Sequence, residues 1–355
     1  MSGRVLLITP KFYGIEKKIK SALEESGYEV VWIENKTLLL DYHGTESKLK
    51  PLRRIYFALF SPQVRYLRKE LKKTGNKEFD ILFAINAHIV CRFLLKKLKA
   101  NNPRLFSIIY FWDSFSKFNW TREIKLFDKV FTFDSADSVQ YKIDYRPNFY
   151  IRPAFKINYD QKFALFFVGK FSPERLYILD RITDKTENTD LNFFIRLWPA
   201  YKIYLHNKFV YKILSRLHFK GIWKKKYLLN FEVVEGKLKR EYLITESMDF
   251  DEVQSNLLRS NVILDLPFKN QTGYSHRLIE ALANGKKVVT TNVNIRKEIF
   301  FNPEQIHILD DEYPDVNLNW IKNISEFAAD SSFLNLELSN WLKSIFNVWI
   351  AKNKD

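Results

Sequence analysis

Cysteine and glycine are scarce in this sequence, and each scarcity excludes a class of protein. One cysteine, Cys91, stands among 355 residues, so no disulfide can form within the chain and no cysteine cluster can hold a metal. The 10 glycines are too few for a collagen-like or linker-rich chain. The sequence therefore describes a compact globular protein. Its length exceeds what one hydrophobic core usually covers, so we expect two domains.

Long hydrophobic runs and several strong motifs are also missing. No window approaches the roughly 18 apolar residues of a membrane span, and the run RVLLIT (4–9) is shorter than the core of a signal peptide, so it predicts a buried strand. GxGxxG, GxxxxGK[S/T], HExxH and paired CxxC motifs do not occur, which removes the usual signals for dinucleotide binding, P-loop and zinc sites. We expect a cytoplasmic protein without a spanning segment.

Positive charge exceeds negative charge by 16, and two segments carry the whole excess. Residues 48–73 hold nine Lys and Arg against one acid, and residues 201–230 hold eight against none. Both interleave cations with Phe, Tyr, Leu and Ile, which suits an anionic membrane surface, where each cation contributes about 1 kcal/mol. A nucleic-acid surface and the solvated faces of two ordinary helices stay open as alternatives. We favour the membrane surface as the partner, with no nucleic acid.

Strands and helices alternate along the chain in two series, separated by the proline-containing stretch 147–160. Alternation predicts parallel sheets with right-handed crossovers. We therefore predict an α/β protein with two doubly wound, Rossmann-like domains facing each other across a cleft. The domains cover 1–155 and 156–330, and a C-terminal helix in 331–355 packs back towards the first. Strands are expected at 4–9, 29–34, 80–86, 105–112, 129–134, 163–169, 192–198, 231–236, 262–267 and 287–292. Helices are expected near 15–26, 88–99, 173–184, 249–260, 274–284 and 331–352.

The stretch 262–292 (VILDLPFKNQTGYSHRLIEALANGKKVVTTN) carries the chemistry. Its loop leads into a helix whose first N–H groups and positive dipole end attract an anion. Gly273 has no side chain where a phosphate would approach, and Arg277 lies one turn further on. Glu280 follows on the same face, about 10 Å along the axis from Gly273, where a carboxylate can accept two ribose hydroxyls. The groups of this nucleoside-diphosphate site are Gln271, Thr272, Gly273, Arg277 and Glu280. Taken singly, Arg277 and Glu280 could form only an ion pair and Gly273 only a turn.

The same stretch resembles the donor-binding region of GT-B glycosyltransferases, above all those of bacterial capsule, O-antigen and lipopolysaccharide gene clusters. Their pattern is Gln-Ser/Thr-Gly, an Arg-x-x-Glu-Ala-Leu helix and a Lys-Lys-aliphatic-aliphatic-Thr-x-Asn strand. Two positions depart from it: Asp265, where a longer carboxylate is usual, and His276, where an aliphatic or hydroxyl residue is usual. The matching residues are Gln271, Thr272, Gly273, Arg277, Glu280, Ala281, Leu282, Lys286, Lys287, Thr290, Thr291 and Asn292.

The resemblance implies the GT-B fold and transfer of a sugar from a nucleotide-sugar donor on the second domain. The acceptor, a saccharide or lipid-linked saccharide, would bind the first domain. Arg277, together with Arg175 or Lys170, would neutralise the leaving diphosphate, so no metal or other cofactor is expected. Nothing near 244–248 selects the nucleobase, and we take a UDP-linked donor as the working expectation. A lipid-linked acceptor would place the protein peripherally at the inner face of the plasma membrane.

Candidate catalytic groups of the first domain lie after its strands. Asp113, in Trp-Asp-Ser, directly follows the strand at 105–112, and His88 follows the strand at 80–86. Either could deprotonate an acceptor hydroxyl, and the resemblance favours Asp113. Otherwise, Asp113 would be a helix cap and His88 the start of a buried helix. Tyr13 and Gly14, in the first strand–helix loop, are expected to line the cleft.

Three alternatives differ in class. A metal-dependent GT-A transferase would use Asp249-Phe250-Asp251, although that string also suits a helix cap. A non-catalytic nucleic-acid- or membrane-binding protein would use the two basic segments and leave the stretch 271–280 without a purpose. A catalytically inactive GT-B relative could serve as a partner subunit.

Overall fold

The computed structural model describes residues 3–36, 62–75, 77–87, 90, 92–116, 121, 123–153, 160–186, 189–198, 244, 248–325 and 327–352. Contacts divide the chain into two units. Unit 1 comprises Met1–Arg152, Phe268–Ile279 and Ser331–Asp355, and unit 2 comprises Pro153–Pro267 and Glu280–Asp330. The first break falls in the proline-containing stretch, whereas segment 268–279, which the sequence analysis assigned to the second domain, belongs to unit 1 by its contacts.

Unit 1 is built on a parallel sheet with the strand order β2-β1-β3-β4-β5-β6. Its central strands β1 (Arg4–Thr9), β3 (Ile81–Ile85) and β4 (Phe106–Phe111) are almost wholly buried. Such continuous apolar runs are typical of parallel strands covered on both faces. The other strands are β2 (Glu29–Glu34), β5 (Lys129–Thr132) and β6 (Asp144–Tyr145). β6 was not foreseen, because it has two exposed residues and no apolar pattern.

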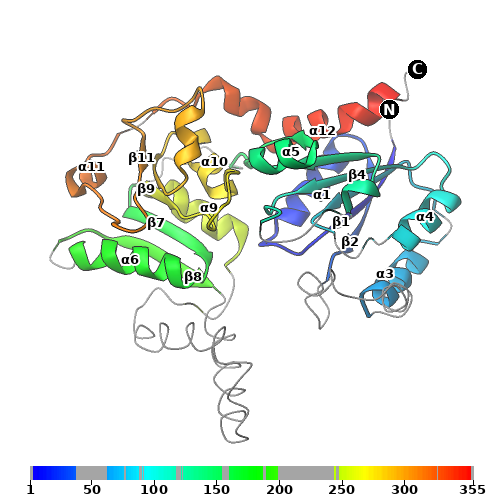
Figure 1. Ribbon diagram of the computed structural model, residues 1–355, viewed down its shortest axis with the longest axis horizontal. Helices are drawn as coiled ribbons and strands as arrows, with labels where there is room; N and C mark the ends of the chain where they lie inside the picture. The colour runs from blue at the N-terminus through cyan, green and yellow to red at the C-terminus, as the bar shows by residue number, and fades with distance from the viewer. Residues whose placement is uncertain are drawn as a thin grey trace, which may run out of the picture. The chain divides into compact units, whose positions relative to one another are not determined.

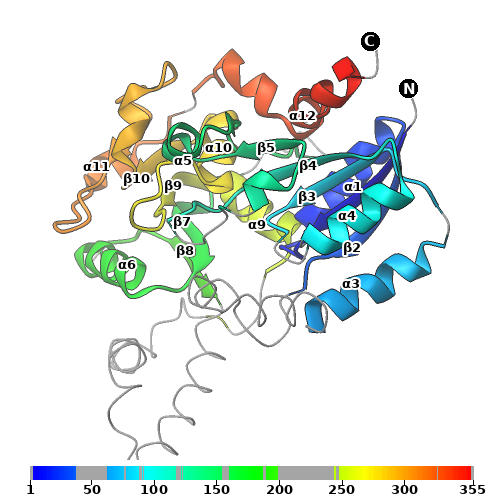
Figure 2. The ribbon, with the colours of Figure 1, turned by 45° about the vertical axis from the view of Figure 1, so that its right-hand side comes forward.

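Helices cover both faces of this sheet (Figures 1 and 2). α3 (Pro62–Lys73) and α4 (Arg92–Asn101) share one core with alternate strand residues such as Leu82 and Ile109. Successive strand residues point to opposite faces, so Phe83 and Tyr110 point the other way. On that face lies α12 (Leu338–Lys352). The ring centroid of its Phe346 is 5.4 Å from that of Phe83, and the ring centroid of its Trp341 is 4.8 Å from that of Tyr110. α12 also contacts α1 (Ile15–Glu25). The shorter helices are η3 (Glu123–Lys125), α5 (Ser135–Tyr141) and η5 (Ser331–Leu336).

Unit 2 has a parallel sheet in the order β11-β10-β9-β7-β8. α6 (Pro173–Thr186) buries Leu176, Leu179 and Ile182 against it, and α9 (Phe250–Leu258) contacts β7 and β9. The strands are β7 (Phe163–Lys170), β8 (Phe193–Trp198), β9 (Ser260–Asp265), β10 (Lys287–Thr290) and β11 (Ile306–Ile308). The remaining helices are α10 (His276–Ala283), which begins in unit 1, η4 (Val293–Lys297) and α11 (Leu318–Lys322). The strand expected at 231–236 lies outside the described residues.

The predicted fold class, an α/β protein with two Rossmann-like units, is confirmed by the two parallel sheets. The single-sheet GT-A alternative does not fit this arrangement. Its candidate metal string begins α9, where the Asp249 side chain accepts the N–H of Asp251 as the N-cap. That is the helix-cap role that the sequence also allows.

Candidate active site at the carboxyl edge of the first sheet

The carboxyl ends of the parallel strands of unit 1 bring polar residues to one edge. Tyr13 and Gly14 follow β1, Asn86 follows β3, Asp113 follows β4 and Asp134 follows β5. Ligands of doubly wound sheets bind at this edge. Tyr13, Gly14 and Asp113 lie at this edge, directly after their strands, while His88 lies outside the described residues.

Asn86 organises the middle of this edge and was missed by the sequence analysis. Its φ of 45° is uncommon for a residue with a side chain, and such strain persists where bonds over-determine the position. Asn86 Oδ1 accepts the N–H of Trp112 at 3.1 Å, and its carbonyl oxygen accepts from Asn35 Nδ2 at 2.7 Å. Asn86 Nδ2 donates to Asp113 Oδ2 at 2.8 Å. The bonds hold the Asp113 carboxylate at the strand end.

The loop between β1 and α1 is also tightly turned. Tyr13 and Gly14 have φ of 54° and 87°, and Gly14 is the N-cap residue of α1. The N–H of Phe12 donates to Oε2 of the buried Glu16 at 3.0 Å, which ties the loop to the first turn of the helix. The Phe12 ring lies 5.5 Å from that of Trp112, so this loop and the end of β4 are neighbours.

Asp134 binds the loop that carries Thr272 and Gly273. Its Oδ2 accepts the N–H groups of Thr272 at 2.9 Å and Gly273 at 3.0 Å, and Oδ1 accepts the Thr272 hydroxyl. The same Oδ1 caps α5 by accepting the N–H groups of Ala136 and Asp137. Asp134 is 1% exposed. Two N–H groups that the sequence analysis reserved for a phosphate are thus bonded to a carboxylate, and nothing local in the sequence marks Asp134 as their partner.

Position 273 has no room for a side chain, because Phe133 lies against it. A Cβ at this position would come within 2.7 Å of the Phe133 carbonyl oxygen and of two carbons of its ring. From the sequence, this glycine is expected to leave room for a phosphate. In the structure, packing against Phe133 already requires a glycine.

Gly273→Ala is therefore expected to lower the free energy of unfolding by about 1–3 kcal/mol, the usual cost of overpacking. Urea denaturation measures this change. Gly3→Ala is the control, because a Cβ there would find its nearest neighbour at 3.3 Å and should be accommodated more easily. Equal stability of the two variants would contradict the packing role.

His276 lies between aromatic rings of unit 1, 4.7 Å from Phe149 and 5.8 Å from Trp112. Its Nδ1 lies 3.0 Å from the carbonyl oxygen of Phe149. Burial lowers the pKa of His276 from 6.5 to about 4, against the opposing effects of the Phe149 bond and of Asp113. The imidazole is therefore neutral at pH 7. From the sequence, His276 stands out only as a departure from the GT-B pattern.

The lowered pKa predicts a pH dependence of stability. Between pH 6.5 and 4 the unfolded chain binds a proton at His276 and the folded chain does not, so stability is complete above pH 6.5 and falls as the pH drops towards 4. The loss amounts to about 3 kcal/mol. Urea unfolding of the wild type and His276→Asn at several pH values isolates it, since the other titrating groups are common to both. A pH-independent difference between them would contradict the shift.

In unit 2, the motif residues Thr290 and Lys287 make hydrogen bonds within the unit. The Thr290 hydroxyl donates to Asp265 Oδ2 at 3.0 Å, and the two residues face each other in the β9–β10 register. Lys287 is buried, and its amine donates to the carbonyl oxygens of Trp320 and Asn323. Glu280 is 6% exposed. The Asp265 departure from the family pattern is thus part of a buried contact between strands.

Arg175 and Lys170, the proposed cations of unit 2, differ in exposure. The Arg175 guanidinium is buried and donates from Nε and Nη2 to the Leu266 carbonyl oxygen and from Nη1 to that of Lys170. These bonds tie the end of β7 to the end of β9. The Lys170 side chain is exposed. Arg175 therefore positions two strand ends, whatever further role it has.

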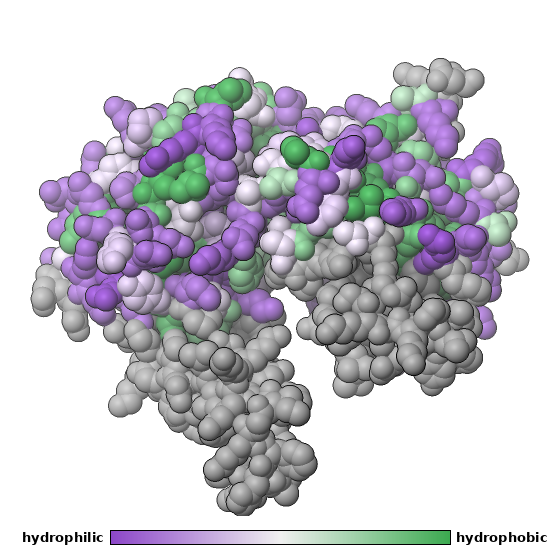
Figure 3. All heavy atoms as spheres, viewed as in Figure 1, coloured by the Kyte–Doolittle hydropathy of each residue, from purple (hydrophilic) through white to green (hydrophobic). Residues whose placement is uncertain are grey.

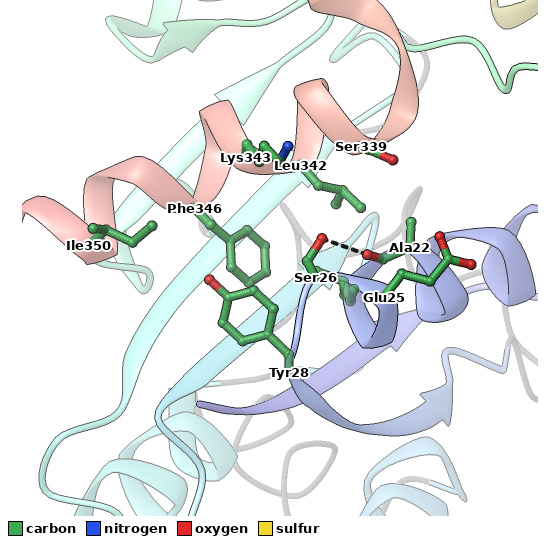
Figure 4. Close-up of a pocket in the computed structure, with 10 residues that line it drawn as sticks. Ala22, Glu25, Ser26, Tyr28, Ser339, Leu342, Lys343, Phe346 and Ile350 are labelled. Atoms are coloured by element: carbon green, nitrogen blue, oxygen red, sulfur yellow. Dashed lines mark hydrogen bonds between the residues drawn. The ribbon is translucent and has the colours of Figure 1, made fainter. Parts of the chain in front are cut away.

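A cavity of about 620 Å³ lies at the other edge of the first sheet, between the end of α1, the start of β2 and α12. Figure 4 shows Tyr28 and Phe346 side by side in it, with Glu25 and Lys343 at its margin. Because it opens where α1 ends and β2 begins, it is separate from the polar residues that follow the strands at the carboxyl edge. In the described part of the chain, no three His, Cys, Asp or Glu side chains converge to hold a metal ion.

Of the two basic segments, the structure describes only residues 62–73, which form α3. Residues 48–61 and 201–230 lie outside the described residues. Val64 and Leu67 are buried in the core of unit 1, and Tyr66 and Leu71 pack against it. The apolar residues that suggested membrane anchors in this part therefore serve the core. On the face in Figure 3, hydrophilic side chains dominate the described surface, with hydrophobic ones in small groups. None of the described helices is long and apolar enough to cross a bilayer.

Comparison with known proteins gives no family assignment. No protein-family model and no curated protein matches the chain. Among solved structures, the chain is similar to the spinosyn rhamnosyltransferase SpnG complexed with spinosyn aglycone, at 11% identity and a TM-score of 0.43, over 97% of this chain and 96% of that one. It is also similar to the GtfA/B complex, at 10% identity and a TM-score of 0.40, over 80% and 60%. Neither likeness is close enough to assign an activity.

Proposed function

We propose that this protein is a glycosyltransferase that moves a sugar from a nucleotide-sugar donor to a saccharide or lipid-linked saccharide in surface polysaccharide or lipopolysaccharide synthesis. The observation that carries the proposal is the ordered stretch 271–292, which runs from a loop through α10 into β10 of a two-sheet α/β fold. The position of Asp113 at a strand end beside Trp112 supports an acceptor side for the same reaction.

The proposed reaction uses two groups of residues. Arg277 would pair with the donor diphosphate and Glu280 with the ribose, and Lys170 would add a second cation without a metal. Gln271, Thr272 and Gly273 stay in the proposed donor loop. The N–H groups of Thr272 and Gly273 would bind a phosphate only after releasing the Asp134 carboxylate. Asp113 would take the proton of the acceptor hydroxyl as the new bond to the sugar forms and the bond to the diphosphate breaks.

A thermal-shift screen against UDP-, GDP- and dTDP-sugars tests the donor. A ligand at 100 times its Kd stabilises by about 2.7 kcal/mol, enough to raise the melting temperature visibly. Glu280→Ala should remove most of this shift, because a buried carboxylate that receives the ribose hydroxyls is lost. Lys297→Ala, in η4, is the surface control. A wild type that no nucleotide sugar stabilises would reject the proposed function.

Attachment to an anionic membrane belongs to the same proposal and depends mainly on 48–61 and 201–230. A lipid-linked acceptor would lie at the inner face of the plasma membrane, where the cations of these segments and of α3 meet anionic headgroups. The interaction would be peripheral and sensitive to salt.

A further inference from the structure

One buried acceptor beside Trp112, at the carboxyl edge of the first sheet, has no hydrogen bond. Nε2 of His276 is buried and has no partner among the residues that the structure describes. Nδ1 is engaged with the carbonyl oxygen of Phe149 at 3.0 Å. A carbonyl oxygen only accepts, so Nδ1 carries the hydrogen and Nε2 presents a lone pair. Leaving a buried acceptor unpaired is unfavourable. The unpaired Nε2 lies at the carboxyl edge of the sheet, where ligands bind, so we expect a ligand to supply its hydrogen-bond donor.

The neighbours of His276 have the chemistry of a saccharide subsite. The half-buried Trp112 ring lies edge-on to the imidazole, and beyond it lies the Phe12 ring, which is 39% exposed. Asp113, the next residue after Trp112, accepts a hydrogen bond from Asn86 Nδ2 at 2.8 Å. Its negative charge acts to raise the pKa of His276, against the larger effect of burial. Aromatic rings with a few fixed acceptors are typical of sites for polyhydroxylated ligands, because the rings cover C–H faces while the acceptors receive hydroxyls.

We propose that Nε2 of His276 accepts a hydroxyl hydrogen from a bound saccharide whose ring lies on Trp112 and Phe12, with a second hydroxyl at Asp113. The inference rests on the proposed function and identifies the acceptor side of that reaction. Because Nε2 is buried in this structure, the side chains that cover it have to move when the saccharide binds. His276 is thus a binding residue, and Asp113 keeps the proton-transfer role.

His276→Asn separates this role from a structural one. The asparagine amide can still donate to the Phe149 carbonyl oxygen from a position near Nδ1, but it has nothing in place of Nε2. His307→Asn is the matched control, since His307 also lies beside a tryptophan, 5.9 Å from Trp320, but in unit 2. In transfer assays with the best donor of the screen, His276→Asn should raise the KM for saccharide acceptors at least tenfold. The donor KM should stay unchanged, and His307→Asn should change neither. An unchanged acceptor KM in His276→Asn would overturn the inference.

A second measurement does not require turnover. Long-range ¹H–¹⁵N spectra of protein labelled at histidine report the tautomer, and the His276 signals are assigned by their loss in His276→Asn. We expect the Nδ1–H tautomer at pH 7, and a shift of the Nε2 resonance when a panel of methyl glycopyranosides is added. A hydrogen on Nε2, or no response to any of these glycosides, would overturn the inference.

The two measurements distinguish the two proposals. If glycosides shift Nε2 while no nucleotide sugar binds, the saccharide site stands and the transferase proposal fails. If transfer proceeds and His276→Asn behaves as the wild type, the transferase proposal stands and the inference on His276 fails.

Discussion

Asp134→Ala is expected to lower the free energy of unfolding by about 3–5 kcal/mol, as for a broken buried network around a charged group. The carboxylate accepts two N–H groups and a hydroxyl from the loop at 272–273 and two N–H groups of α5. Removing it leaves the buried N–H groups of Gly273 and Asp137 without this acceptor. Chemical denaturation measures the loss, and hydrogen exchange at Thr272 and Gly273 reports whether the loop is released.

Asp249→Ala is the matched control for this experiment. Asp249 is also the N-cap of a helix, α9, but it is exposed and its side chain accepts the N–H of Asp251 at 3.3 Å. Loss of such a cap costs about 1 kcal/mol. Asp134→Asn should fall between the two alanine variants, because an amide retains one accepting oxygen. If Asp134→Ala costs no more than Asp249→Ala, the loop does not depend on this carboxylate.

Asp113→Asn is expected to reduce turnover 10²–10⁴-fold, the range typical for loss of a general base, while donor affinity stays within twofold. The replacement is nearly isosteric, and the new amide can turn its oxygen towards Asn86 Nδ2, so the bond that positions the side chain is retained. Stability should therefore change little. Steady-state kinetics with the donor that the thermal-shift screen selects measure the effect.

His88→Ala is the second arm of this experiment, because His88 follows the neighbouring strand in the sequence. Near-normal turnover in Asp113→Asn together with a large loss in His88→Ala would transfer the role of base to His88. Comparable losses in both would indicate that the two side chains share the proton. An Asp113→Asn protein with a lower melting temperature would instead indicate that the carboxylate mainly stabilises the strand end.

Much of the fold follows from local patterns in the sequence. The apolar runs that became β1, β3, β4 and β9 are short, rich in branched residues and separated by helical stretches, a pattern that parallel sheets covered on both faces require. The Asn-Gly turn after α10 is also local, since Gly285 adopts a φ of 67° that glycine tolerates best. Asp113 could be placed at a strand end for the same reason, because the strand before it is plain in the sequence.

The partners of the site residues were decided by the tertiary structure. Asp134 is 138 residues from Thr272, His276 is 127 residues from Phe149, and Arg175 is 91 residues from Leu266. No periodicity of 2 or 3.6 residues encodes such pairs, because the pattern of one segment records which face is buried and not what lies against it. A carboxylate, an imidazole or a guanidinium looks the same in the sequence whether its partner is a phosphate, water or a distant main-chain group. The sequence thus determined most of the strands and the edge at which their polar residues gather. Long-range packing decided that Asp134 holds the loop, that Phe133 requires Gly273 and that the half-buried His276 is neutral.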